Sequence, residues 1–160
     1  MMGGYALVLS AARRSTVKIG SKTFDLELGK YAYAGSALGP GGIECRVGRH
    51  IRRFTQAGAE GTRGEPQVRH WHIDYLPPTM SLVAVVAAES RERLECRLTH
   101  ALKASGAQAI KGFGATDCRE GCGGHLLFLG GKSGESAVAI VSSAFRQMRR
   151  QPVQMFQQKG

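Results

Sequence analysis

Residues 31–54 read YAYAGSALGPGGIECRVGRHIRRF, and the succession of patterns in this stretch decides the fold. Alternation over 31–36 predicts a strand, because side chains two residues apart share one face of a sheet. Residues 38–42 hold glycines and a proline and predict a break. Residues 43–54 then predict an amphipathic helix with an apolar stripe and a neighbouring arginine stripe. We therefore expect a strand that turns directly into a basic helix.

Strands and helices are also predicted on both sides of this stretch. Because they mix without strict alternation, the predicted fold class is α+β, a small mixed or antiparallel sheet flanked by helices. We expect one domain, with its core in residues 3–129 and a C-terminal helix and tail in 130–160 packed on it. The further predicted elements are strands over 5–9, 69–76, 82–88 and 125–129, a hairpin over 17–28, and helices over 91–104, with Ser90 as N-cap, and 136–150.

The composition predicts a polyanionic partner. Among 160 residues, Lys and Arg number 22 and Asp and Glu 12, which gives a net charge of +10. Such an excess favours phosphate, so we expect nucleic acid rather than a membrane as the partner. No apolar run reaches the roughly 18–20 residues of a membrane span, and no basic leader precedes an apolar segment at the N-terminus. We therefore expect a cytoplasmic protein, and no motif indicates an organic cofactor.

Two tyrosines and a basic helix are the most informative candidates for chemistry. Tyr5 opens the first predicted strand, and Tyr33 closes a later strand that leads into the helix. Arg46 and His50 are four residues apart and therefore neighbours on that helix. A guanidinium can orient a phosphodiester, and a phenol or imidazole can activate water. Glu95, beside the leucine stripe of the next predicted helix, offers a carboxylate for a divalent cation.

This arrangement resembles the GIY-YIG endonuclease superfamily. Tyr5 matches the tyrosine of the first motif, and the sequence YAGS at 33–36 is similar to the second. The order of motifs is closest to the small stand-alone Uri-superfamily endonucleases, with the hairpin over 17–28 as an insertion. The further matching motifs are ALGPGG at 37–42, RVGRH at 46–50, HWHIDYL at 70–76, the Glu95-Cys96 pair, and GFG at 112–114 before Asp117-Cys118.

The resemblance implies hydrolysis of phosphodiester bonds, with DNA favoured over RNA. Glu95 would hold Mg²⁺ or Mn²⁺, and Arg46 would contact the scissile phosphate. Tyr5 or His50 would activate water, and Tyr33 would hydrogen-bond to the phosphate or the water. The residues expected to contact flanking nucleic acid are Ser36, Arg49, Arg53, His70 and His72.

A second polar cluster lies in residues 70–75. If this segment is a strand, His70, His72 and Asp74 share one face and Trp71 lies on the other. The histidines would then stand at the rim of the site. Alternatively, the polar face forms a structural hydrogen-bond network over an aromatic core.

The cysteines form a possible zinc site. Cys118, Cys122 and His125 have the spacing Cys-x3-Cys-x2-His, and Cys96 could be a fourth ligand. Zinc takes four nitrogen or sulfur ligands in a tetrahedron. Alternatively, the thiols are buried or lie in loops, and His125 bonds to backbone.

Three functions remain open at this point. The first is a metal-dependent endonuclease. The second is a nucleic-acid-binding module on the same fold with weak or no catalysis. The third is a zinc-stabilised protein that binds another protein.

Overall fold

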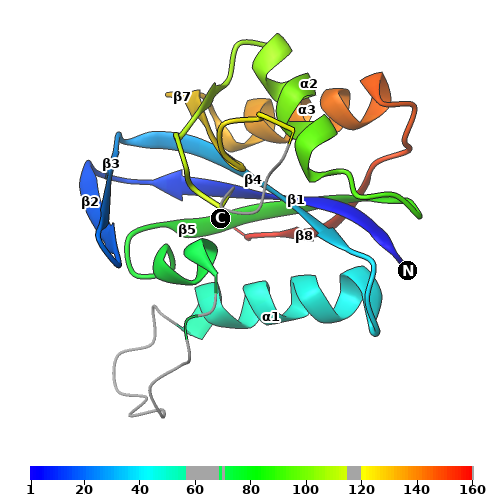
Figure 1. Ribbon diagram of the computed structural model, residues 1–160, viewed down its shortest axis with the longest axis horizontal. Helices are drawn as coiled ribbons and strands as arrows, with labels where there is room; N and C mark the ends of the chain where they lie inside the picture. Colours follow the sequence, from blue (N-terminus) through cyan, green and yellow to red (C-terminus); the bar gives the residue numbers. More distant parts are fainter. Residues whose placement is uncertain (57–68, 70, 115–119, 160) are drawn as a thin grey trace.

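The computed structural model describes residues 1–56, 69, 71–114 and 120–159. In this part of the chain, a six-stranded antiparallel sheet carries helix α1 on one face and helices α2 and α3 on the other (Figure 1). A separate two-stranded hairpin extends from one end of the sheet. The fold is therefore α+β, as the sequence predicts.

The order of the strands in the sheet differs from their order in the chain. The sheet order is β6-β7-β4-β1-β5-β8, and β2 pairs only with β3 among the described strands. The strands are β1 (Gly3–Ala11), β2 (Ser15–Ile19), β3 (Lys22–Leu26), β4 (Gly29–Ala37), β5 (Ser81–Glu89), β6 (Gln108–Ala109), β7 (Leu126–Gly130) and β8 (Val153–Gln157). The helices are α1 (Gly42–Gln56), the 3-10 helix η1 (His72–Tyr75), α2 (Glu95–Ala104) and α3 (Gly134–Gln147).

Strand β1 lies inside the sheet, between β4 and β5, and is buried on both faces. Leu7 and Leu9 pack in the core on the α1 side, whereas Ala6 and Val8 pack in the core on the side of α2 and α3. All four side chains are fully buried. The alternation predicted for β1 thus divides its side chains between two separate cores.

The predicted hairpin and helices are present, with shifted ends. The leucine stripe of α2 is confirmed, since Leu98 and Leu102 are fully buried against the sheet. Helix α3 begins earlier than predicted because the Ser133 hydroxyl accepts the Ser136 N–H at 3.1 Å and caps it. It ends at Gln147, and Arg149 then takes a positive φ of 58°.

The strand predicted over residues 69–76 is wrong for the residues that are described, because 72–75 form η1. The Asp74 carboxylate accepts the Trp71 N–H at 3.0 Å, and the Asp74 N–H bonds the Trp71 carbonyl at 3.0 Å. These bonds close a turn where an extended chain was expected. Asp74 is consequently buried and Trp71 is 47% exposed, the reverse of a strand with an aromatic inner face. His70 lies outside the described residues.

The predicted start of α2 is also wrong, by about one helical turn. Ser90 forms a local turn with Glu92 and does not cap the helix, since its hydroxyl accepts the Glu92 N–H at 3.0 Å. The helix begins at Glu95, where the Leu94 N–H instead finds an acceptor on β4, the Ser36 hydroxyl, at 2.9 Å. A side chain distant in sequence therefore sets this boundary.

Two strands, β6 and β8, were not predicted from the sequence. Strand β8 pairs antiparallel with β5 through residues 153–157 and completes one edge of the sheet. The tail that was predicted to pack on the domain therefore contributes a strand to its central sheet.

Replacing Gly35 with alanine tests how closely β4 and β1 are packed. A Cβ at this position would lie 2.5 Å from Tyr5 Cζ, so the buried ring must move. We expect Gly35→Ala to lower the free energy of unfolding by about 1–3 kcal/mol, as overpacking of a core does. Urea denaturation measures the change. Gly131→Ala is the matched control, because its Cβ meets no atom within 4 Å, and an equal loss in both variants would contradict this packing.

Candidate functional site

A cavity of about 670 Å³ opens between α1, the ends of β1 and β4, and the start of α2. The two tyrosine-bearing strands are adjacent, with Tyr5 opposite Gly35 and Tyr33 opposite Leu7 in the register. The turn after β4 brings α1 across the same face. The cavity thus joins residues that are far apart in the sequence. The predicted site residues that line it are Tyr5, Tyr33, Ser36, Arg46, Arg49, His50, His72, Glu95, Cys96 and His125.

A buried hydrogen bond joins β1 to α1 at the floor of the cavity. The Tyr5 hydroxyl lies 2.9 Å from His50 Nε2, and both side chains are almost completely buried. The Tyr33 ring stands edge-on to His50, with centroids 6.4 Å apart. The two tyrosine motifs and the helix histidine therefore form one contiguous group.

Burial fixes the protonation of this group. It raises the pKa of Tyr5 to about 12, although the charges of Arg46 and Arg49 oppose the shift. Burial likewise raises the pKa of Tyr33. It lowers the pKa of His50 to about 4, and the positive charge of Arg49 acts in the same direction. At neutral pH the imidazole is neutral, and a neutral imidazole protonated at Nδ1 can accept the phenol proton at Nε2.

Arginines of α1 supply positive charge to the cavity. Arg46 and Arg49 both line it. The Nε and Nη2 atoms of Arg49 are buried and have no hydrogen-bond partner among the described residues. Leaving buried N–H donors unsatisfied is costly, and a guanidinium is shaped to bind two oxygens of a phosphate or carboxylate. Arg49 is therefore arranged to receive an anion.

Arg53, although predicted to contact nucleic acid, is placed differently. Its guanidinium lies 3.2 Å from the fully buried carboxylate of Asp74. This ion pair connects the end of α1 to η1, and Arg53 is not among the residues that line the cavity. The pair provides the buried carboxylate with a counter-charge, as buried charges require.

Glu95 is held at the cavity wall by β4. It is the first residue of α2, and its side chain is 17% exposed. Ser36 donates its hydroxyl to Glu95 Oε2 and also accepts the Leu94 N–H, so it fixes both the carboxylate and the start of the helix. The other oxygen lies 3.7 Å from the largely exposed Arg93. A half-buried carboxylate of this kind is a suitable ligand for a hard divalent cation.

His72 reaches the rim of the cavity from η1. Its Nδ1 accepts the Gly114 N–H at 2.8 Å, and its ring packs against Phe24 and Phe113. Burial and the charge of Lys22 lower its pKa. Trp71 and Arg93 also line the cavity, and the sequence analysis did not assign either to the site. The sequence signal that could have identified the position of Trp71 was Asp74, three residues later. An aspartate at that spacing favours a capped turn over a strand.

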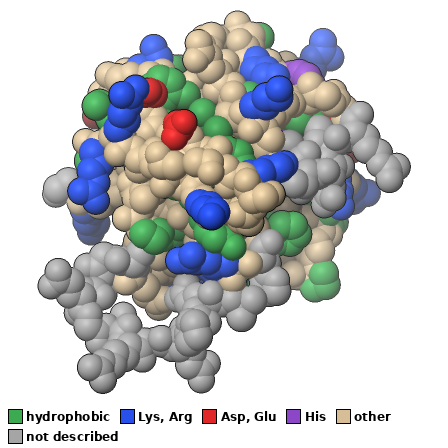
Figure 2. Space-filling view, turned by 60° about the vertical axis from the view of Figure 1, so that its left-hand side comes forward, with side chains coloured by type: hydrophobic (Ala, Val, Ile, Leu, Met, Phe, Trp, Pro, Cys, Tyr) green, Lys and Arg blue, Asp and Glu red, His purple; other side chains and the backbone are tan. Residues whose placement is uncertain are grey.

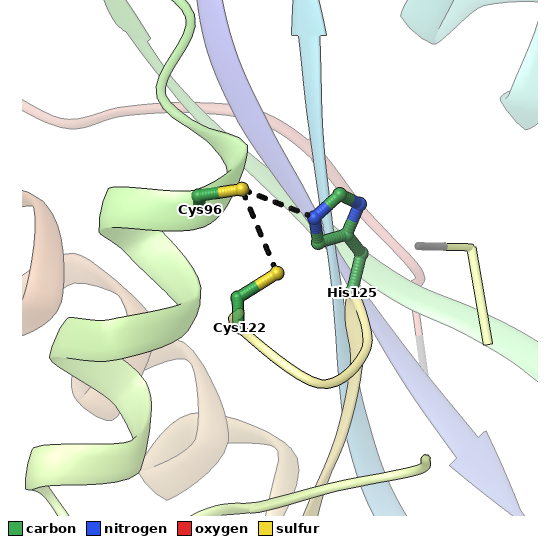
Figure 3. Close-up of side chains that lie close together, drawn as sticks. All are labelled: Cys96, Cys122 and His125. Carbon is green, nitrogen blue, oxygen red and sulfur yellow. Dashed lines mark hydrogen bonds between the residues drawn. The ribbon is translucent and has the colours of Figure 1, made fainter. Parts of the chain in front are cut away.

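A group of two cysteines and one histidine lies beside Glu95. Cys96 Sγ is 3.5 Å from Cys122 Sγ and 3.5 Å from His125 Nε2, and Figure 3 shows all three side chains pointing toward one another. These three residues form a possible metal-binding group, which bears out the sequence prediction to that extent. Cys118 lies outside the described residues.

The fold and this site define a small α+β domain with a basic cavity and a possible metal-binding group. Residues 4–150 match the model of a family described as "Domain of unknown function DUF123", and the chain belongs to that family. No curated protein and no solved structure gives a significant match. None of the helices in the described residues is long and apolar enough to cross a membrane.

The buried imidazole predicts a specific dependence of stability on pH. The pKa of His50 falls from 6.5 to about 4 on folding, so between these values the unfolded chain binds a proton that the folded protein does not. The free energy of unfolding is therefore expected to decrease as the pH falls through this range, by about 3 kcal/mol from this group.

Urea denaturation of wild type and His50→Gln between about pH 7.5 and pH 4.5 measures this contribution. We expect the wild type to lose more stability than the variant over that interval, because His50 is present only in the wild type. The carboxylates titrate in both proteins, so their contribution cancels in the comparison. Parallel curves would show that His50 is not a neutral buried imidazole.

Proposed function

We propose that the protein is a metal-dependent endonuclease of the GIY-YIG type, as the resemblance to the Uri-superfamily branch implies. The observation that carries this proposal is the cavity itself. It combines a buried phenol–imidazole pair, two arginines and a carboxylate, which are groups that can activate water, bind a phosphodiester and hold a cation. The family match identifies the domain and says nothing about a reaction. The reaction is therefore a matter for experiment.

The arginines would bind the substrate. Arg46 and Arg49 project from successive turns of α1, so one phosphodiester can accept hydrogen bonds from both. The Arg49 nitrogens that have no acceptor within the described part of the chain would then gain one, and the developing negative charge would face two cations. Flanking phosphates would meet the basic surface. On the face shown in Figure 2, Lys and Arg side chains are scattered widely, and acidic side chains gather in its upper left part.

The Tyr5–His50 pair would activate water by a concerted proton relay. As the water oxygen attacks phosphorus and the P–O bond to the leaving sugar oxygen breaks, Tyr5 Oη takes the proton of the water and passes its own proton to His50 Nε2. The leaving sugar oxygen takes a proton from solvent. A phenol with a pKa of about 12 is protonated at neutral pH, so it acts as a base only if a partner accepts its proton in the same event. Neutral His50 is that partner.

Glu95 would hold the divalent cation, Mg²⁺ or Mn²⁺. Such an ion, when bound, polarises a phosphoryl oxygen and offsets its charge. One carboxylate, with water and phosphate oxygens, is a common way for proteins to bind Mg²⁺. The bond from Ser36 keeps the carboxylate in one orientation before substrate arrives.

Two observations favour a second candidate, a nucleic-acid-binding module without turnover. Both oxygens of Glu95 already have partners, Ser36 and Arg93. Burial also keeps the phenol of Tyr5 protonated at neutral pH, so the phenolate that could act as a base is scarce. This candidate predicts binding of nucleic acid through Arg46 and Arg49 with no cleavage.

A cleavage panel separates the two. Supercoiled plasmid, branched DNA, single-stranded DNA and RNA are incubated with the protein and Mg²⁺ or Mn²⁺. We expect nicking that stops when the cation is removed. Glu95→Gln, Arg46→Ala and Tyr5→Phe should each reduce the rate by about 10²–10³-fold, the usual cost of losing a group that stabilises the transition state.

Matched controls come from exposed positions. Glu135→Gln makes the same chemical change on the surface of α3, and Arg97→Ala removes a surface arginine, so both should cleave at the wild-type rate. Salt-dependent binding without cleavage on any substrate would reject the nuclease and support the binding module. Undiminished cleavage by Glu95→Gln would reject the assigned cation ligand.

A further inference from the structure

The Cys96, Cys122 and His125 group lies next to the proposed site and takes no part in the chemistry assigned there. Cys96 belongs to the first turn of α2, whereas Cys122 and His125 lie on the segment that leads into β7 (Figure 3). Cys122 is fully buried and His125 is 9% exposed. Two thiols and an imidazole therefore meet in the wall of the domain from two different parts of the chain.

The two separations measured from Cys96 Sγ are close to those around a tetrahedral ion, and all three ligand atoms lie within 4.8 Å of one another. Bonds of about 2.3 Å to sulfur and about 2.0–2.1 Å to nitrogen at a tetrahedral angle separate two sulfurs by roughly 3.8 Å and a sulfur and a nitrogen by roughly 3.5–3.6 Å. The observed separations from Cys96 Sγ are 3.5 Å to Cys122 Sγ and 3.5 Å to His125 Nε2. A disulfide would require about 2.05 Å between the sulfurs.

The donor set selects the kind of ion. Thiolate and imidazole are the ligands that Zn²⁺ takes in structural sites, whereas Mg²⁺ and Ca²⁺ prefer oxygen. We propose that Cys96, Cys122 and His125 supply three of the four ligands of a Zn²⁺ ion, with water completing the tetrahedron, and that this ion clamps the first turn of α2 to the segment before β7. The proposal is independent of the nuclease proposal.

The surrounding contacts indicate that the ion has a positioning role. His125 is already fixed to the sheet, because the Ala34 N–H donates to its carbonyl at 2.9 Å and its own N–H donates to Phe113 at 2.8 Å. Lys103, at the other end of α2, donates to the Cys122 carbonyl at 2.5 Å. An ion held by Cys96 would secure the beginning of α2 in the same way. Glu95, the preceding residue, would then be held at the cavity wall.

Metal content provides the primary test. Untagged protein is produced in zinc-supplemented medium, purified without chelator, and analysed by elemental mass spectrometry. We expect about one zinc per chain in the wild type. Cys96→Ser and Cys122→Ser should lose it. Cys45→Ser is the matched control, because Cys45 is exposed and outside the group, and it should keep the full equivalent.

Cobalt spectroscopy and hydrogen exchange test the geometry and the role. Co²⁺ in place of zinc should give the thiolate charge-transfer band and the visible bands of a tetrahedral site, and Cys96→Ser should lose them. Removing zinc with a chelator should speed exchange of the amides of residues 98–100, whose acceptors lie in the first turn of α2, and leave exchange in the β2–β3 hairpin unchanged. Glu95→Gln should retain zinc, so a failed nuclease assay leaves this test intact.

Two results would overturn the proposal. One is wild-type protein that takes up no stoichiometric zinc or cobalt, a result that does not depend on whether any variant folds. The other is a full equivalent of zinc in folded Cys96→Ser or Cys122→Ser, with folding confirmed by circular dichroism.

Discussion

The packing of Tyr5 is the constraint on which the rest of the site depends. Its ring fills the space over Gly35, where a Cβ would collide with it, and its hydroxyl meets His50 at 2.9 Å. One side chain therefore links β1, β4 and α1. Because β1 lies between β4 and β5 and is buried on both faces, this link is made in the interior of the sheet.

The electrostatics of the cavity follow from the same burial. Burial keeps His50 neutral and Tyr5 protonated, so among the described residues the charges that line the cavity come from its walls. Arg46 and Arg49 supply positive charge from α1, whereas Glu95 and Arg93 lie together on the opposite side. An anion that binds Arg46 and Arg49, as proposed above, would therefore not have to displace Glu95 from them. Asp74, the nearby buried carboxylate, is paired with Arg53.

The periodicity of hydrophobic residues was sufficient to predict the strands and helices that bury one regularly repeating set of side chains. The strands around Tyr5, Tyr33 and residues 82–88 and the leucine stripe of α2 are of this kind. Prediction failed where a distant or single side chain decides the local structure. Ser36, on β4, sets the start of α2 through the Leu94 N–H, and Asp74 closes η1 on Trp71. In the site, spacing made Arg46 and His50 neighbours, but no local pattern could place His50 against Tyr5, because strand pairing and helix packing create that contact.

Adjacent residues of α2 offer ligands of opposite preference. Glu95 presents hard carboxylate oxygens to the cavity, and Cys96 presents a soft sulfur to the thiol–imidazole group in its wall. A hard ion such as Mg²⁺ prefers the carboxylate, and a softer ion such as Zn²⁺ prefers thiols and imidazole. The two groups of donors would therefore not compete for the same ion. The two differ in their surroundings as well. The carboxylate remains partly exposed, as a cation that exchanges with substrate requires, whereas Cys122 is fully buried, as a permanent structural ion requires. The first turn of α2 is therefore the point where stability and chemistry in this domain would be coupled.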